Sequence, residues 1–250
     1  ALCLVIGMLP MAVLAEETTG SGTGTGAATT QSPITFSYPV AGDDKKPSKA
    51  ETIIMNAGDA TKYWTTGAYN ANFTDSKMMK AGTENDYSVK LEYPTGGSPV
   101  LTLKNAELYG ELLLIAKDKV DSTEEKTFDG TAKVVLEGEN KGTFNIRFNA
   151  KEAIVTGTGS MVTDKNIYGF NSTGCGIVHN SNGNLTLDNV NIKMDLLPNK
   201  SEAAGHGVGV IGGDIIIKGG TLKITIGGSN GEITSILLEG PTEVVKVYEI

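Results

Sequence analysis

One short pattern returns six times along the chain: an apolar pair, then any residue, then Asn or Gly. Its Asn or Gly positions are separated by 19 to 33 residues, and Thr replaces the first apolar residue twice. Repetition at such a period is typical of stacked repeats. Asn and Gly tolerate a positive φ, so each copy predicts a sharp bend after a strand. The six bend positions are Asn105, Gly138, Gly157, Asn189, Gly219 and Gly240.

The residues between the bends predict an all-β fold. Gly, Thr, Val, Ile and Asn dominate the second half of the chain, and no sustained helical period is present. Residues 183–194 align with 213–224, and each block alternates apolar with polar residues on both sides of its bend. The sequence therefore predicts a right-handed single-stranded parallel β-helix, a solenoid. The alternative is an antiparallel sandwich, which needs more tight hairpins than the chain offers.

Composition divides the chain into four predicted regions. Residues 1–15 are apolar with small residues at the end, which predicts the core of a secretory signal peptide without its basic start. Residues 16–33 predict a Gly/Thr/Ser linker, and residues 34–97 an irregular N-terminal cap. The β-helix coils are predicted over 98–250, and we expect this region to be truncated at its C-terminus. We expect a secreted or cell-surface monomer with no membrane span in the mature chain.

Aromatic residues gather in the predicted cap and give the first candidate site. Rings stack on the apolar faces of sugars, so Tyr63, Trp64 and Tyr69 are candidate ligand-binding residues. The alternative is that these rings pack into the end of the apolar stack. The net charge of −8, without a basic stripe, argues against nucleic acid as a partner.

Acidic residues in neighbouring repeats give a candidate metal site. In the predicted stacking, Asp188 and Asp195 lie beside Asp214 of the next coil. Stacked carboxylates repel one another, and a hard cation such as Ca²⁺ bridges them through oxygen ligands. Isolated surface acids explain the same residues, so both interpretations stay open.

Three motifs bear on catalysis. Gly205-His206-Gly207 matches the Gly-His-Gly motif of polygalacturonases, but the other motifs of that family are missing from the predicted coils. The repeat alignment explains these residues as the counterpart of Gly174-Cys175-Gly176. The same alignment places Cys175 beside His206, where core filling is the favoured interpretation. Arg147 is a candidate base for a lyase, against the simpler interpretation as a solvated side chain on a strand.

The repeats over about residues 99–240 resemble the secreted carbohydrate-binding domain-containing proteins of clostridial and related gut bacteria. The resemblance rests on segments such as 101–106, 134–140, 154–160 and 214–222. It implies a fold similar to that of pectate lyases and binding of polygalacturonate with calcium at the cell surface. We therefore expect a non-catalytic protein that binds extracellular polysaccharide, of an acidic pectin-like kind with Ca²⁺. The alternatives are an adhesin or surface stalk, and a polysaccharide lyase or hydrolase.

Overall fold

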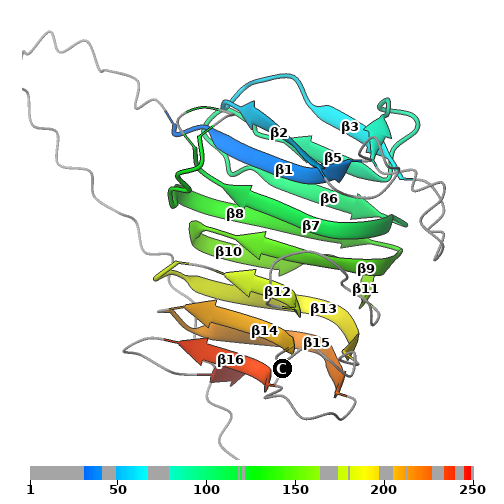
Figure 1. The fold of residues 1–250 in the computed structure, drawn as a ribbon, viewed down its shortest axis with the longest axis vertical. Coiled ribbons are helices and arrows are strands. Elements are labelled where there is room, and N and C mark those ends of the chain that lie inside the picture. The colour runs from blue at the N-terminus through cyan, green and yellow to red at the C-terminus, as the bar shows by residue number, and fades with distance from the viewer. Residues whose placement is uncertain are drawn as a thin grey trace, which may run out of the picture. The chain divides into compact units, whose positions relative to one another are not determined.

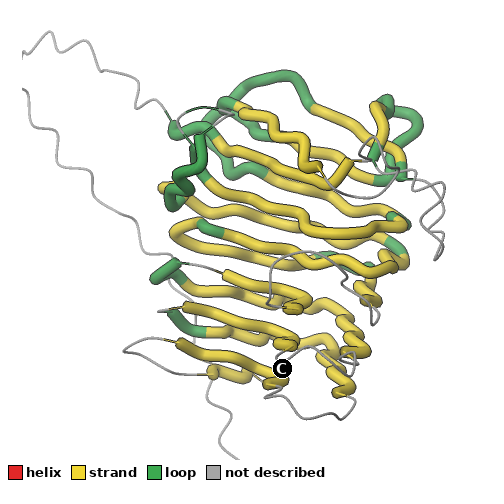
Figure 2. The backbone as a smooth tube through the Cα atoms, viewed as in Figure 1, coloured by secondary structure: helices red, strands yellow, loops and turns green. Residues whose placement is uncertain are grey.

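The computed structural model describes strands and loops and, among the residues it describes, no helix (Figure 2). The described residues are 31–40, 49–66, 79–117, 119, 122–163, 174–179, 181–196, 205–211, 213–226, 234–239 and 245–248. The predicted all-β class is confirmed. The predicted signal peptide lies outside the described residues, as does the linker up to residue 30. The strands are β1 (Ile34–Val40), β2 (Lys49–Met55), β3 (Lys62–Thr65), β4 (Lys80–Ala81), β5 (Val89–Glu92), β6 (Val100–Lys104), β7 (Glu107–Ile115), β8 (Phe128–Glu137), β9 (Glu139–Phe148), β10 (Ala150–Thr156), β11 (Ser160–Thr163), β12 (Gly174–His179), β13 (Asn184–Leu196), β14 (Gly205–Ile211), β15 (Ile215–Ile226), β16 (Thr234–Glu239) and β17 (Val245–Tyr248).

Parallel pairing joins strands of successive repeats. β6, β8, β10, the first half of β13, the first half of β15 and β17 pair in that order. After the bends, β7 pairs with β9, β9 with β11 and β12, and β12 with β14, which pairs with β16. Figure 1 shows these strands following one another down the sheet in chain order.

Antiparallel pairing governs the first third of the described chain. β1 lies between β2 and β7 and is antiparallel to both. β5 lies between β3 and β6, again antiparallel to both. The sheets are therefore mixed, and the described strands form neither a closed nor a solenoid sheet. The prediction of a right-handed single-stranded parallel β-helix with an irregular N-terminal cap is wrong.

A tight turn explains part of this error. The amide of Gly97 donates to the carbonyl of Pro94 at 3.0 Å, and Gly96 has φ +73°. A short connection of this kind joins antiparallel neighbours, whereas a parallel pair needs a long crossover. The segment 93–99 therefore folds β5 back against β6, contrary to the expectation that the chain offers few tight hairpins.

The predicted bends are confirmed wherever the structure describes them. Asn105 and Asn189 have φ of 47° and 52°, and they are the non-glycine residues with positive φ among those described. Gly138, Gly157 and Gly219 have φ of 62°, 122° and 71°. Gly240 lies outside the described residues. The repeated pattern therefore marks the corners of the backbone correctly, although the sheet built from them is mixed.

The internal alignment of the repeats is confirmed residue by residue. Leu187 pairs with Ile217 and Ile192 with Leu222 in the parallel register of β13 and β15. Alternate residues of β13 face the core, because Leu185, Leu187, Ile192 and Met194 are at most 1% exposed. One apolar cluster runs from Ile34 to Ile215.

Strands from both sides of residue 97 belong to one compact unit, Gln31–Ile250. β1 and β5 precede this position and pair with β7 and β6, which follow it. Described strands of the predicted cap are therefore continuous with the strands of the first repeat.

Candidate functional site

Trp64 on β3 is buried and belongs to the core. Its side chain is 6% exposed, and its ring meets Phe36 and Tyr38 edge to face, with ring centroids 5.4 Å apart in both pairs. Edge-to-face packing at this distance is favourable between aromatic rings. The ring of Trp64 therefore does not face a ligand in this structure, and the packing interpretation accounts for it.

Tyr63 faces the other side of β3, where it meets a second tyrosine. The ring centroids of Tyr63 and Tyr87 lie 5.5 Å apart, and both side chains are partly exposed. Lys104 at the end of β6 places its Nζ 5.0 Å from the centre of the Tyr87 ring. A cation over a ring face is attracted by the ring quadrupole and holds the ring in place.

Lys90 on β5 completes this surface. It is opposite Tyr63 in the antiparallel register, and its Nζ lies 3.1 Å from Glu92 Oε1. Burial disfavours the charged amine, but the hydrogen bond and the charge of Glu92 outweigh it and raise the pKa of Lys90. The amine therefore stays protonated at neutral pH. We call the surface formed by Tyr63, Tyr87, Lys90 and Lys104 the tyrosine platform.

Tyr69, the third predicted ligand-binding residue, lies outside the described residues. Of the two predicted rings that the structure describes, Tyr63 lies at the surface, and a tyrosine and two lysines lie beside it. Antiparallel pairing of β3, β5 and β6 brings these side chains together. A parallel stack, the predicted arrangement, does not place Lys90 beside Tyr63.

The three predicted metal ligands are spread along two strands. Asp214 lies at the register of Asn184, because its amide donates to Asn184 Oδ1 at 3.0 Å. Asp188 lies four residues further along and pairs with Lys218, so the two aspartates are separated by about 13 Å of strand. Asp195 follows the bend and pairs with Thr225. The backbone therefore does not bring Asp188, Asp195 and Asp214 into one coordination sphere.

No other grouping replaces this site in the part of the chain that the structure describes. Three or more His, Cys, Asp or Glu side chains do not converge anywhere among those residues. The structure does not describe the side chain of Asp195. Calcium binding therefore stays a prediction, and the predicted aspartates do not supply its geometry.

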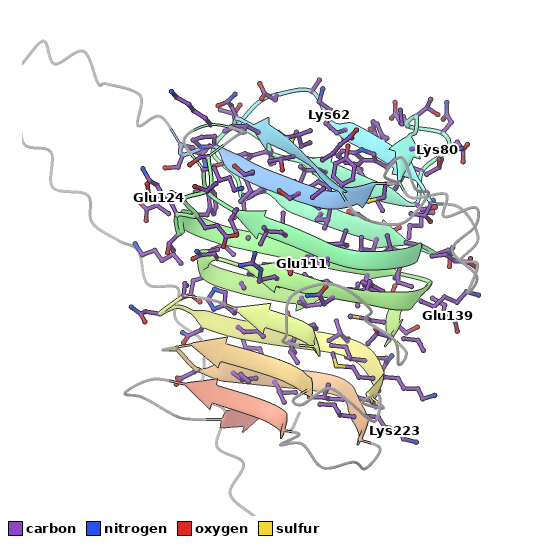
Figure 3. All side chains as sticks on the ribbon, in the orientation of Figure 1. Lys62, Lys80, Glu111, Glu124, Glu139 and Lys223 are labelled. Atoms are coloured by element: carbon purple, nitrogen blue, oxygen red, sulfur yellow. The ribbon has the colours of Figure 1, made fainter. Side chains whose placement is uncertain are left out.

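Arg147 on β9 is held by two glutamates. Its Nη1 and Nη2 donate to both oxygens of Glu125 at 2.7 and 2.8 Å, and its Nε donates to Glu111 Oε2 at 3.1 Å. Figure 3 shows Glu111 on β7, on the face turned to the viewer. Burial opposes the charge of Arg147, but Glu125 and Glu111 outweigh it and raise the pKa of the guanidinium. A base must be neutral to accept a proton, so this pairing disfavours Arg147 as a lyase base.

The predicted neighbours Cys175 and His206 are opposite each other in the register of β12 and β14. The backbone pairing therefore confirms the repeat alignment, in which Gly205-His206-Gly207 is the counterpart of Gly174-Cys175-Gly176. The side chains of both residues lie outside what the structure describes.

His179 at the end of β12 is a buried polar residue that the sequence analysis missed. Its side chain is fully buried, and its Nε2 lies 2.8 Å from the carbonyl oxygen of Ala150. The pattern contained the information, since His179 follows the inward-facing Ile177 by two residues on one strand.

Comparison of the chain with protein-family models, with curated proteins and with solved structures found no match in any of the three. The resemblance to secreted carbohydrate-binding proteins therefore stays a prediction. Among the described residues, no helix is long and apolar enough to cross a membrane.

Proposed function

We propose that this protein is a non-catalytic extracellular polysaccharide-binding protein that holds its ligand on the tyrosine platform. The observation that carries the proposal is the pair of partly exposed rings of Tyr63 and Tyr87, 5.5 Å apart and fixed by Lys104. Tyrosine offers an apolar face and a polar hydroxyl on one side chain. A sugar ring needs the same combination, because it has apolar C–H faces and a rim of hydroxyl groups.

The rigidity of the platform supports this proposal. Tyr63 lies on a strand that is paired on both sides, with β4 and with β5. Trp64, the next residue, anchors that strand in the core through two aromatic contacts. A ring held in this way loses little conformational entropy when a ligand binds, which favours affinity.

The charge of the platform favours an acidic, pectin-like ligand. The chain has a net charge of −8, which repels an anionic polymer, but Lys104 places an ammonium group over the Tyr87 ring. Lys90, opposite Tyr63, supplies a second ammonium group that Glu92 partly compensates. Opposite charges at close range steer a ligand and fix its position. Calcium is the other means of overcoming the repulsion, and the experiment below separates the two.

A binding role agrees with the surroundings of Arg147. The candidate base of the lyase alternative is paired with Glu111 and Glu125, as described above. Secretion, predicted from residues 2–15, would place the protein among extracellular polysaccharides.

A binding assay with polygalacturonate and with a neutral glucan, each with and without EDTA, tests the proposal. We expect polygalacturonate to bind in both buffers. The Tyr63→Ala and Tyr87→Ala variants each weaken binding about tenfold, which corresponds to about 1.4 kcal/mol. Tyr63→Phe keeps the ring and most of the affinity.

Lys62→Ala is the matched control, because Lys62 is the exposed neighbour of Tyr63 on the same strand. Its affinity should equal that of the unmodified protein. Absence of binding to both polymers would overturn the proposed function. Binding that survives in the Tyr63→Ala/Tyr87→Ala double variant would overturn the assignment of the site. Loss of binding in EDTA would show that calcium, and not the lysines, offsets the repulsion between the acidic protein and the acidic polymer.

A further inference from the structure

His179 lies in the apolar core between two parallel neighbours. In the register of the sheet it is opposite Phe148 of β9 and Val210 of β14. The rings of Phe148 and His179 are 6.4 Å apart and close to edge-on. A histidine at such a position has lost its hydration and depends on its protein partners.

A backbone carbonyl group at the start of β10 accepts a hydrogen bond from His179. The Nε2–H donates to the carbonyl oxygen of Ala150, and the hydroxyl of Ser181 bonds the same oxygen. The Ser181 hydroxyl in turn accepts the amide of Gly183 at 3.2 Å. His179 and Ser181 together therefore fasten the turn at 181–183, which connects β12 to β13, to the start of β10.

The other ring nitrogen, Nδ1, has no hydrogen-bond partner in the described part of the chain. Nδ1 is buried and makes no hydrogen bond among the described residues. Since Nε2 donates, Nδ1 is the unprotonated nitrogen of a neutral imidazole. Uptake of a proton at Nδ1 would place a positive charge and an unsatisfied donor in the core.

No acidic group among the described residues faces the imidazole to compensate that charge. β9 presents the Phe148 ring, β10 the Ala150 carbonyl, and the turn the Ser181 hydroxyl and the backbone of Gly183. The charged groups next to these residues are engaged elsewhere, Arg147 with Glu111 and Glu125, and Lys151 with Asp129 at the surface. β14 contributes Val210 at this register, a residue without charge.

We propose that His179 is a pH-sensitive latch, which holds the 181–183 turn against β10 when neutral and releases it when protonated in acid. Burial is the largest influence on this group and lowers the pKa of His179, while hydrogen bonds to the backbone of Ala150 and Gly183 only partly restore it. The open form therefore takes up the proton first. Stability from the neutral latch is complete above about pH 6.5, the ordinary value of histidine, and is lost as the pH falls below it.

The packing of the turn makes its release consequential. A Cβ placed on Gly183 would lie 1.7 Å from the carbonyl oxygen of Lys151, and one on Gly213 would lie 1.9 Å from the carbonyl oxygen of Gly183. Three backbone segments thus meet without intervening side chains. Movement of the turn away from β10 separates these contacts and loosens the beginning of β13.

Hydrogen–deuterium exchange of the full chain at pH 7.5, 6.5 and 5.5, corrected for the intrinsic exchange rate, tests the latch. We expect the opening of residues 174–196 to increase by up to about tenfold between pH 6.5 and 5.5, the limit for one proton. Residues 100–115 serve as the internal reference and should change much less. In the His179→Gln variant, whose side chain stays neutral, the acid response of 174–196 disappears.

His206→Gln is the matched control, since His206 is the second of the two histidines in the chain. This variant should keep the acid response. The latch is overturned if 174–196 responds no more than 100–115, if His179→Gln retains the response, or if His206→Gln abolishes it. Should His179→Gln fail to fold, the imidazole resonances of the unmodified protein decide: a neutral Nε2–H form that persists below pH 6.5 supports the latch, and titration at the ordinary histidine value without local opening overturns it.

Discussion

The side-chain amide of Asn105 lies where a β-carbon on Gly138 would stand. An ideal Cβ at Gly138 would fall 2.0 Å from Asn105 Oδ1. The same oxygen accepts the amide of Glu139 at 3.1 Å. The bend of one repeat is therefore held by the side chain from the bend before it, and the glycine leaves room for this contact.

The Gly138→Ala substitution tests this relationship. The backbone at Gly138 has φ +62°, which costs an L-residue about 1 kcal/mol, and the new methyl group displaces the Asn105 amide from its hydrogen bond at about 1 kcal/mol more. We expect the free energy of unfolding to fall by about 2 kcal/mol in urea denaturation.

Gly96→Ala separates the two costs. Gly96 also has a positive φ of 73°, but a Cβ there meets nothing within 4 Å. It should lose only the backbone contribution of about 1 kcal/mol. In an Asn105→Gly background, Gly138→Ala should cost no more than Gly96→Ala; equal costs in both backgrounds would refute the contact.

Asn140 joins three bends from inside the protein. It is fully buried, and its Oδ1 accepts the amide of Ala106 at 3.0 Å. Its Nδ2 donates to the carbonyl oxygens of Glu137 and Ser160 at 3.3 and 3.2 Å. Asn140→Ala leaves these backbone groups buried without partners, so we expect a loss of about 2–4 kcal/mol in thermal or urea unfolding.

Asn191→Ala is the control for Asn140. Asn191 is exposed on β13, and its Oδ1 accepts one hydrogen bond, from the Thr221 hydroxyl. This variant should stay within about 0.5 kcal/mol of the unmodified protein. A similar stability of the two variants would show that the buried contacts of Asn140 contribute nothing special.

Arg147→Lys should destabilise the protein although it keeps the charge. A lysine ammonium cannot reproduce the two parallel hydrogen bonds to Glu125 together with the third to Glu111. The site is about three-quarters buried, so we expect a loss of about 1 kcal/mol.

The surface pair Lys151–Asp129 provides the comparison for Arg147. Its side chains are 70% and 76% exposed, and Lys151→Ala should have no measurable effect on unfolding. Both variants are measured at low and high salt, and the loss in Arg147→Lys should persist at high salt because a partly buried pair is screened less than an exposed one. An Arg147→Lys variant as stable as the unmodified protein would mean that the paired geometry is not stabilising.

The local backbone was more predictable than the sheet it builds. A positive φ depends on the residue itself and its neighbours, so the repeated Asn and Gly gave the bends at Asn105 and Gly138 correctly. Strand direction depends on which distant segments meet. The insertion of β1 between β2 and β7 joins residues about 80 positions apart, and no local pattern encodes it.

The candidate site shows the same limit. The sequence pointed to aromatic residues near position 63, but Tyr63 is partly exposed and Trp64 is buried. Which of two successive residues faces the solvent depends on how the strand is oriented in the sheet. Asp188 and Asp214 were grouped because they lie in neighbouring repeats, yet a four-residue offset in register keeps them apart. Residue type predicted the chemistry of the surface, and the register decided which groups meet.

Deprotonation of Tyr38 should lower the free energy of unfolding of the protein at alkaline pH. Its hydroxyl donates to Glu51 Oε2 at 2.5 Å, and burial, followed by this hydrogen bond, raises the pKa of Tyr38 to about 12. Because the folded pKa lies above the unfolded value of 10.0, the stabilisation is complete below pH 10 and is lost as the pH rises toward 12.

Tyr38→Phe tests this expectation, because phenylalanine has no phenolic proton to lose. The unfolding free energy of the unmodified protein should therefore fall more steeply than that of Tyr38→Phe over this range, by up to one proton's slope, about 1.4 kcal/mol per pH unit. Other tyrosines and the lysines titrate in both proteins, so the difference between the two curves isolates Tyr38. Parallel curves would show that the phenol of Tyr38 ionises as readily in the folded chain as in the unfolded one, and that its bond to Glu51 does not hold it protonated.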